Sequence, residues 1–177
     1  MPVLTCGHGR LDGEQLGSLL ADAGVECLID VRRFPGSRRN AAAASGAIEA
    51  LTTGLGISYR WDSRLGGRRR LSAADDAASP DSWWKVAAFR AYAGWTRSEE
   101  CRAGLLDLVA AAQGNRTAIM CSEAVWWRCH RRLISDVLVL EHELPVQHLM
   151  HDGRLTEHRP SDGARVGSDG RVLWDAV

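Results

Sequence analysis

The strongest chemical signal in this sequence is a cysteine at the end of an apolar segment. Residues Thr117-Ala118-Ile119-Met120-Cys121 have the pattern of a buried strand, and the polar pair Ser122-Glu123 follows them. We expect a helix to start in Trp126-Trp127-Arg128-Cys129-His130-Arg131-Arg132. A thiol between a strand and a helix N-terminus, beside arginines, is favoured as the thiolate. The pattern therefore predicts a reactive cysteine.

Two side chains near Cys121 are candidates for proton transfer. Glu123 lies in the same loop, and His130 lies within the first turn of the expected helix. The catalytic candidates are therefore Cys121, Glu123 and His130. A buried structural cysteine is the alternative explanation of Cys121. The Trp126-Trp127 pair could cap the core, or it could stack on a flat ligand ring.

Arginines are concentrated in three segments, which suggests an anion site. Residues 30–39, 64–70 and 128–132 together contain 11 arginines and a single acid, although the net charge of the chain is zero. A neutral chain has no general attraction for nucleic acids or membranes, but these segments would attract a small anion if they met in space. The candidate ligand-binding residues are Gly7, His8, Asp30, Arg32, Arg38, Gly66, Gly67, Arg68, Trp126 and Arg131. Asp30 is a candidate for orienting one of the arginines.

The spacing of apolar residues predicts strands that alternate with helices. Strands are expected at residues 3–6, 27–31, 57–61, 117–121 and 146–150, and helices at about 12–23, 41–53, 83–93, 96–112 and after 126. Residues 72–82 are expected to form a loop. Capping boxes are expected at Asp12 with Gln15 and at Thr96 with Glu99. Asp152-Gly153 is typical of a hairpin turn, and Asp169-Gly170 suggests another hairpin in the tail.

These elements predict an α/β fold of three layers. We expect a mainly parallel sheet, with helices on both faces and an antiparallel hairpin at the C-terminal end. The glycine turn at residues 7–9, the segment 30–39, the loop 65–68 and the loop after Cys121 would then all follow carboxyl ends of strands. Open parallel sheets bind ligands at that edge. We therefore expect one pocket, lined by His8, Asp30, Arg32, Gly66, Cys121, Glu123 and His130.

The composition limits the class of protein. A chain of 177 residues with 45% hydrophobic and 25% charged residues fits a single domain spanning residues 1–177. No apolar run is long enough to cross a membrane, and the first residues lack the pattern of a signal peptide. Five cysteines without framework spacing fit reduced thiols. We therefore expect a cytoplasmic protein that does not bind membranes. Cys6, Cys27 and Cys101 are expected to be small core residues.

Six motifs in order resemble a known family. They are Thr5-Cys6-Gly7-His8-Gly9, Leu28-Ile29-Asp30-Val31-Arg32, Phe34-Pro35-Gly36-Ser37-Arg38, Leu65-Gly66-Gly67-Arg68, Met120-Cys121-Ser122-Glu123 and Cys129-His130-Arg131. Together they are similar to the family catalogued as domain of unknown function 488, and in particular to its tryptophan-bearing branch. The resemblance covers about residues 3–158, and it leaves residues 159–177 as a C-terminal extension. It implies a compact α/β domain with these residues around one cleft, and it implies no particular reaction or cofactor.

Three classes of function remain open. The first is a cysteine-dependent enzyme that acts on a phosphorylated, nucleotide-like or other anionic small molecule. A standard cysteine phosphatase is excluded, because the first arginine after Cys121 is Arg128, one position too far for the Cys-x5-Arg spacing. The second is a zinc or iron protein that uses Cys121, Cys129 and His130, although this spacing matches no common zinc motif. The third is a nucleotide or nucleic-acid binding module without catalysis.

For the first two classes the sequence makes opposite predictions. We expect sulfate, phosphate or a nucleotide to stabilise an anion-binding protein, and Arg131→Ala to abolish that effect without harm to the fold. The reason is that Arg131 is expected to lie off the core face of Leu133, Ile134 and Val137. A metal protein would instead carry stoichiometric metal and lose stability with a chelator. The sequence does not identify a cofactor.

Overall fold

A computed structural model describes residues 1–37 and 39–176 of the chain. The strands are β1 (Val3–Gly7), β2 (Cys27–Asp30), β3 (Ser58–Trp61), β4 (Thr117–Cys121), β5 (Val146–Leu149), β6 (Leu155–Glu157), β7 (Ala164–Val166) and β8 (Val172–Trp174). The α-helices are α1 (Gly13–Asp22), α2 (Ala47–Gly54), α3 (Ala73–Ala77), α4 (Ala87–Thr96), α5 (Glu99–Gly114) and α6 (Arg131–His142). Short 3-10 turns cover Ala41–Ala43 (η1), Ser63–Leu65 (η2) and Trp126–Arg128 (η3).

The main sheet confirms the predicted α/β fold. Six strands lie in the order β3-β2-β4-β1-β5-β6, and all neighbours are parallel except β5 and β6. Strands β7 and β8 form a separate antiparallel hairpin near the C-terminus. After β1 the chain crosses to β2, on one side of the central β4-β1 pair. After β4 it crosses to β5, on the other side of that pair. The loops after β1 and β4 therefore diverge, and this arrangement creates a crevice at the carboxyl ends of parallel strands.

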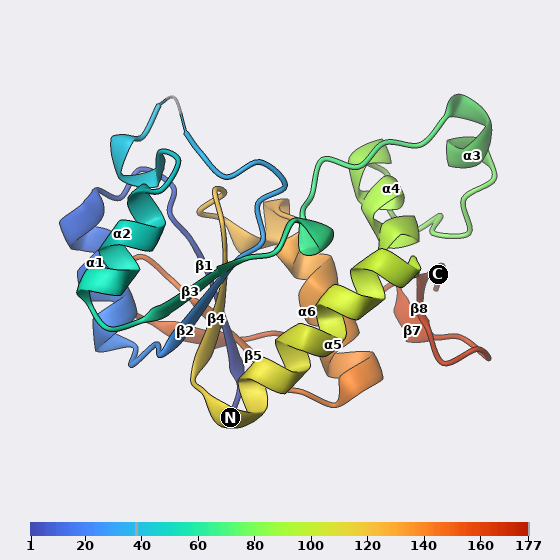
Figure 1. Cartoon of the computed structure of the whole chain (residues 1–177). Coiled ribbons are helices and arrows are strands. Elements are labelled where there is room, and N and C mark those ends of the chain that lie inside the picture. The colour runs from blue at the N-terminus through green and yellow to red at the C-terminus, as the bar shows by residue number, and fades with distance from the viewer. Residues whose placement is uncertain (38, 177) are drawn as a thin grey trace.

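Helices cover both faces of the sheet because the strand residues alternate between two cores (Figure 1). One core contains Leu4, Leu28 and Met120 with the buried faces of α1 and α2. The other contains Ile29 and Ile119 with buried residues of α4, α5 and α6. This alternation is what a strand with a side-chain period of two requires when it is buried on both faces.

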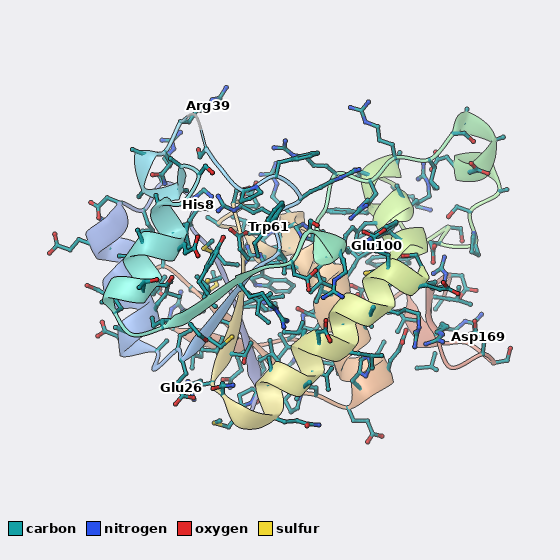
Figure 2. All side chains as sticks on the ribbon, viewed as in Figure 1. His8, Glu26, Arg39, Trp61, Glu100 and Asp169 are labelled. Carbon is teal, nitrogen blue, oxygen red and sulfur yellow. The ribbon has the colours of Figure 1, made fainter. Side chains whose placement is uncertain are left out.

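The polar loops that follow β1, β2, β3 and β4 gather at one end of the sheet. Figure 2 shows His8, after β1, and Arg39, in the loop after β2, on the side of the molecule opposite Glu26, which precedes β2. Strands β1, β2, β3 and β4 all run toward this side, so their following loops meet there. The sheet thus brings together the polar segments that the sequence separates by more than a hundred residues.

Several local expectations hold, and others need correction. The capping box of Asp12 and Gln15 is present at the start of α1. The second cap is not Thr96 but Ser98, whose hydroxyl accepts a hydrogen bond from the backbone N–H of Cys101. The segment at 72–82 contains the short helix α3, with Ser72 as its cap. Helix α4 begins at Ala87 and not at Trp83.

The helix after the cysteine loop also begins later than expected. The turn η3 occupies Trp126–Arg128, and the regular helix α6 starts only at Arg131. Cys129 and His130 therefore lie in the connection before α6. Of the described helices, none is both long and apolar enough to cross a membrane.

Candidate functional site

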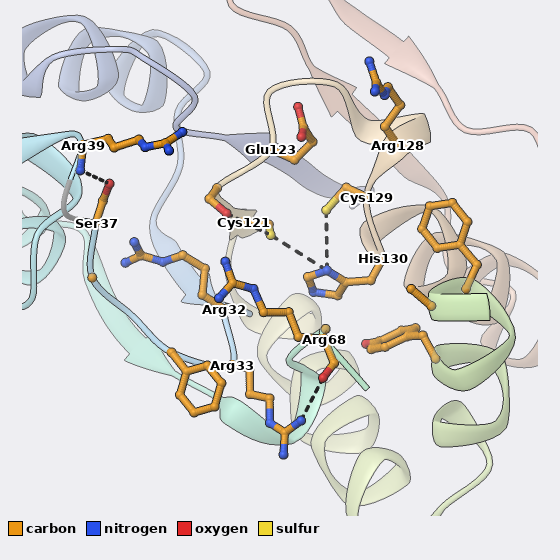
Figure 3. Close-up of a pocket in the computed structure, with 17 residues that line it drawn as sticks. Arg32, Arg33, Ser37, Arg39, Arg68, Cys121, Glu123, Arg128, Cys129 and His130 are labelled. Carbon is orange, nitrogen blue, oxygen red and sulfur yellow. Dashed lines mark hydrogen bonds between the residues drawn. The ribbon is translucent and has the colours of Figure 1, made fainter. Parts of the chain in front are cut away.

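A cavity of about 800 Å³ lies at the carboxyl ends of the parallel strands (Figure 3). The loops after β2, β3 and β4 form much of its wall, and α4 closes one side. The lining residues are Arg32, Arg33, Phe34, Gly36, Ser37, Arg39, Gly67, Arg68, Ala88, Phe89, Tyr92, Cys121, Ser122, Glu123, Arg128, Cys129 and His130. All three catalytic candidates from the sequence are among them. So are Arg32, Gly67 and Arg68.

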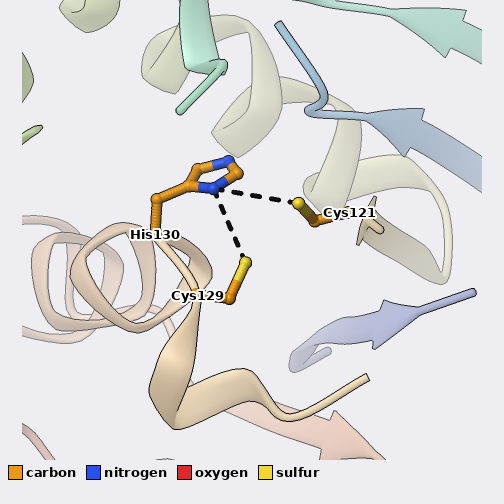
Figure 4. Close-up of side chains that lie close together, drawn as sticks. All are labelled: Cys121, Cys129 and His130. Carbon is orange, nitrogen blue, oxygen red and sulfur yellow. Dashed lines mark hydrogen bonds between the residues drawn. The ribbon is translucent and has the colours of Figure 1, made fainter. Parts of the chain in front are cut away.

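Two thiols and an imidazole meet in this cavity (Figure 4). Nδ1 of His130 lies 3.5 Å from Sγ of Cys129 and 3.8 Å from Sγ of Cys121. The strand β4 positions Cys121 at its last residue, and η3 followed by extended backbone positions Cys129. Both thiols are nearly buried, at 7% and 5% exposure, so they reach solvent only through the cavity.

The other ring nitrogen fixes the tautomer of His130. Nε2 lies 3.0 Å from the backbone carbonyl oxygen of Val31, which can only accept a hydrogen bond. In the neutral ring Nε2 therefore carries the proton and Nδ1 is unprotonated. Once Nδ1 takes a proton from a thiol, the ring becomes a cation beside the thiolate. Gly67 leaves the space that this ring needs, because a Cβ at that position would lie 2.7 Å from Nδ1. The result is an imidazole nitrogen held against two thiols.

The environment distinguishes Cys121 from the core cysteines. Hydrogen bonding from Cys129, together with the charges of His130 and Arg131, holds the pKa of Cys121 well below its usual range despite burial. Burial raises the pKa of Cys129 well above its usual range, so Cys129 keeps its proton and donates. Burial also raises the pKa of Cys6 and of Cys101 to about 12. Cys121 is thus the favoured thiolate of the cavity.

Arginines stand on the opposite side of Cys121 from His130. Figure 3 shows the guanidinium groups of Arg32, Arg39 and Arg68 on that side, whereas the side chain of Arg128 points away from the thiols. Glu123 is the only acid in the lining, and its carboxylate is also directed away from Cys121. Arg39 and Arg68 therefore make this wall cationic, whereas the charge of Arg32 is balanced by an ion pair with Asp30. The predicted role of Glu123 in proton transfer has no contact with the thiols to support it.

A buried carboxylate holds one of these arginines in place. Asp30 is fully buried and accepts hydrogen bonds from Nε of Arg32 at 2.9 Å and from NH2 at 2.5 Å. The hydroxyl of Tyr59 donates to the same carboxylate at 2.9 Å, and NH1 of Arg32 donates to the carbonyl of Ala43 at 3.1 Å. Asp30 thus orients Arg32, and it lies beneath the cavity instead of lining it.

Arg68 adopts a conformation that is unusual for arginine. Its φ is 58°, in the left-handed region, and its carbonyl oxygen accepts a hydrogen bond from NH1 of Arg33 at 2.9 Å. Left-handed backbone costs a residue with a Cβ about 1 kcal/mol or more, and such strain tends to be kept where it serves a site. Here the conformation projects the Arg68 side chain into the cavity (Figure 3).

The expectation that Arg131 lies off the core face is wrong. Arg131 is only 1% exposed, and it is one of the largest fully buried side chains of the described chain. Its NH2 group donates to the backbone carbonyl of Glu123, and its Nε lies 3.5 Å from Sγ of Cys129. The side chain thus joins Glu123 and Cys129 on the buried side of the loop, and its charge acts on the thiols from within the protein. It does not line the cavity.

Other predicted ligand-binding residues also lie outside the cavity lining. A Cβ at Gly7 would fall 1.9 Å from the carbonyl oxygen of Glu123, so this glycine allows the cysteine loop to pack on β1. Gly66 packs in the same way against the backbone of Arg33. His8 is buried, with Nδ1 3.1 Å from the carbonyl of Gly9. Arg38 lies outside the described residues.

Trp126 has a different environment from the one expected of a ligand platform. Its ring stacks on His148, with 3.8 Å between ring centroids and 8° between planes. Trp126 does not line the cavity, and the aromatic residues that do are Phe34, Phe89 and Tyr92. Tyr92 packs beside His130 and hydrogen-bonds the carbonyl of Leu65 at 2.7 Å. Nothing in the helical spacing of residues 87–96 distinguishes a cavity wall from core, so the sequence contains no signal for the rings of Phe89 and Tyr92.

Arg33 and Arg39 belong to the arginine-rich segment 30–39 but are not among the ligand-binding candidates that the sequence indicates. The signal for them was the clustering itself. The structure brings residues from all three arginine segments to one cavity, namely Arg32, Arg33, Arg39, Arg68 and Arg128. Arg64 and Arg69 do not take part, because Arg64 pairs with Asp62 and Asp107, and Arg69 binds the backbone of the β3 loop.

Comparisons with known proteins agree with the resemblance seen in the motifs. The family model described as domain of unknown function DUF488 matches residues 13–138, which include the loops after β2, β3 and β4. No curated protein and no solved structure matches the chain. The matched region covers more than half of the 177 residues. The chain therefore belongs to the DUF488 family.

Proposed function

We propose that the protein is an enzyme that uses Cys121 as a nucleophile on a small anionic molecule. The observation that carries the proposal is the placement of Cys121 between Nδ1 of His130 and a wall of three arginines. His130 would take the thiol proton and later return it to the leaving group. Arg32, Arg39 and Arg68 would hold a phosphate, carboxylate or similar anion, and the rings of Phe34 and Phe89 would contact an apolar or flat part of the substrate.

A phosphatase loop remains a poor description of this site. The first arginine after Cys121 is Arg128, and its side chain is directed away from the thiol (Figure 3). The arginines that face Cys121 come from other loops, after β2 and β3. The proposal is therefore nucleophilic chemistry on an anion, without the phosphate-cradling loop of that enzyme class.

A matched pair of alkylating reagents tests both parts of the proposal. Iodoacetamide is neutral and iodoacetate is an anion, and both alkylate thiolates. We expect Cys121 to react near neutral pH at least roughly tenfold faster than Cys6 and Cys101, because only the thiolate attacks. We also expect iodoacetate to react faster than iodoacetamide at Cys121, with phosphate or sulfate competing. Peptide mass spectrometry after brief labelling measures both rates.

Two variants separate the roles of the wall and the base. Arg39→Gln should lower the ratio of the iodoacetate rate to the iodoacetamide rate, while Arg154→Gln should not, because Arg154 is exposed and pairs with Asp152. Gly67→Ala should slow both reagents, because its Cβ would displace His130. Equal rates with both reagents, together with no protection by phosphate or sulfate, would remove the anion site from the proposal. No labelling of Cys121 near neutral pH would remove the nucleophile.

A metal site is the second candidate, and a specific arrangement favours it. The two sulfurs and Nδ1 of His130 all lie within 4.8 Å of one another. Zinc binds thiolate and imidazole, and a ligand histidine usually donates its other N–H to a carbonyl, as Nε2 does here toward Val31. Arg131 argues against a metal site, because its positively charged side chain lies 3.5 Å from Sγ of Cys129 and would repel a cation. Stoichiometric zinc or iron in protein purified without chelator, lost in His130→Ala, would favour this candidate over the nucleophile.

A further inference from the structure

The proposed reaction uses Cys121 but gives no role to Cys129, the second thiol of the cavity. Cys129 follows Cys121 by eight residues, and their sulfur atoms lie within 4.8 Å of each other (Figure 4). Cys121 is fixed by β4, but Cys129 lies on extended backbone between η3 and α6. A bond between sulfurs of about 2.05 Å therefore needs a movement of the connecting loop and not of the sheet.

The remaining cysteines are placed where they cannot take part. Cys6 is next to the site in the sheet, but its side chain belongs to the core of α1 and α2, on the opposite face from Cys121. Cys101 is fully buried in α5. Cys27 begins β2, at the end of the sheet away from the cavity. The cavity therefore contains two of the five thiols, and they face each other.

We infer that Cys121 and Cys129 form a dithiol–disulfide couple that is oxidised by a hydroperoxide entering the cavity. The inference goes beyond the proposed function, but it rests on the same nucleophilic thiol. It assigns a role to each member of the trio. Cys121 attacks the oxidant, Cys129 is the resolving thiol, and His130 passes a thiol proton to the leaving group in each step.

The electrons and protons balance in two steps. In the first, the Cys121 thiolate attacks one oxygen of the hydroperoxide, an S–O bond forms, and the O–O bond breaks. The departing alkoxide takes from Nδ1 of His130 the proton that Cys121 gave up, which frees Nδ1 again. It leaves as the alcohol, or as water where the oxidant is hydrogen peroxide, with Cys121 as sulfenic acid. In the second, Cys129 gives its proton to Nδ1 of His130 and attacks the Cys121 sulfur. The S–O bond breaks, and the hydroxide takes the proton from His130 and leaves as water.

The local structure suits this sequence of events. His130 lies within 3.8 Å of both sulfurs, so one base serves the thiol that attacks and the group that leaves. Both thiols line the same cavity, so the oxidant and the reductant that restores the dithiol use one entrance. Nε of the buried Arg131 lies 3.5 Å from Sγ of Cys129, and this contact positions the resolving thiol from behind the cavity.

The test treats the full-length reduced protein, freed of metal with a chelator, with hydrogen peroxide in slight molar excess. We expect two of the five thiols to disappear, and non-reducing peptide mass spectrometry to find Cys121 linked to Cys129. A dithiol reductant should restore both. In Cys129→Ser the reaction should stop at a Cys121 sulfenic acid, which dimedone traps. Cys27→Ser is the matched control, and it should form the cross-link as the unaltered protein does.

The outcomes separate this inference from the proposed function. A dimedone adduct on Cys121 in the unaltered protein, with no link to Cys129, would overturn the couple but leave the nucleophile intact. Failure of Cys121 to react with either iodoacetamide or peroxide would overturn both. A tightly held metal that shields both thiols from peroxide until it is removed would also overturn the couple as the working state. The cross-link in the unaltered protein decides the matter even if Cys129→Ser does not fold.

Discussion

Two histidine-containing clusters in the described part of the chain are built in opposite ways. The open cluster is Cys121, Cys129 and His130, and it faces a cavity. The sealed cluster is Thr5, His148, His158, Asp136 and Trp174, and it is buried between β5, α6 and the C-terminal hairpin. Both place imidazole rings within hydrogen-bond distance of other polar groups. Of the two, only the open cluster lines this cavity.

In the sealed cluster the polar side-chain atoms contact one another. Thr5 lies 2.7 Å from Nδ1 of His148, whose Nε2 lies 3.0 Å from Nδ1 of His158. Nε2 of His158 is 2.8 Å from Asp136, and Nε1 of Trp174 donates to the other carboxylate oxygen at 2.8 Å. The Asp136 carboxylate thus accepts hydrogen bonds at one end of this chain of contacts, and Thr5 stands at the other. These short contacts suit a structural role. The contacts of 3.5 and 3.8 Å in the open cluster are longer and leave the thiols available for chemistry.

The largest expected effect breaks the sealed cluster. Asp136→Asn keeps the shape of the side chain but puts an NH2 group against a donor, either Trp174 or His158. We expect the free energy of unfolding to fall by about 3 kcal/mol, because buried donors lose their acceptor. Chemical denaturation measures it. Asp162→Asn, at an exposed position nearby, should change it by less than about 0.5 kcal/mol. A small effect at Asp136 would mean that the sealed cluster does not hold the hairpin in place.

The contrast between the clusters also shows how far the sequence could be read. Alternating apolar segments predicted the parallel sheet, and the Asp152-Gly153 and Asp169-Gly170 turns predicted both hairpins. The carboxyl-end rule predicted that Cys121 and Arg32 would meet. These features depend on local pattern and on sheet geometry, which the sequence carries directly.

What the sequence could not provide depends on contacts between distant segments. Arg131 is buried because its partners are the carbonyl of Glu123 and the sulfur of Cys129, and helical spacing contains no information about either. Trp126 turns to His148, a residue on β5, instead of the cavity. Likewise Trp174 is fully buried against Asp136, although residues 159–177 read as an extension. Each of these side chains is placed by tertiary packing and not by its own element.

The next effect is a pH dependence that belongs to the sealed cluster. Burial, with smaller contributions from His158 and Arg131, lowers the pKa of His148 from 6.5 to about 3. Between these pH values His148 binds a proton in the unfolded chain but not in the folded chain. The free energy of unfolding therefore falls as the pH is lowered from about 6.5. The limiting slope for one proton is about 1.4 kcal/mol per pH unit. Denaturation at several pH values should show a shallower slope in His148→Gln, and equal slopes would contradict a buried neutral His148.

The smallest expected effect lies at the cationic wall of the open cluster. Arg68→Gly removes a left-handed conformation that a Cβ disfavours, with φ of 58°. Release of roughly 1–2 kcal/mol of strain is partly offset by the greater freedom of glycine in the unfolded chain, so a gain of at most about 1 kcal/mol is expected. The same change removes a guanidinium from the cavity, so protection of Cys121 by phosphate should weaken. Stability and ligand protection would then move in opposite directions.

Glu143 supplies the matched control for this last change. It is the other described residue with a side chain in the left-handed region, with φ of 52°, and it ends α6 away from the cavity lining. Glycine is the residue that such a helix end prefers. Glu143→Gly should therefore raise stability by a similar amount and leave phosphate protection of Cys121 unchanged. If both variants gained stability and neither lost protection, Arg68 would be a structural feature of the loop, and the anion would have to be held by Arg32 and Arg39 alone.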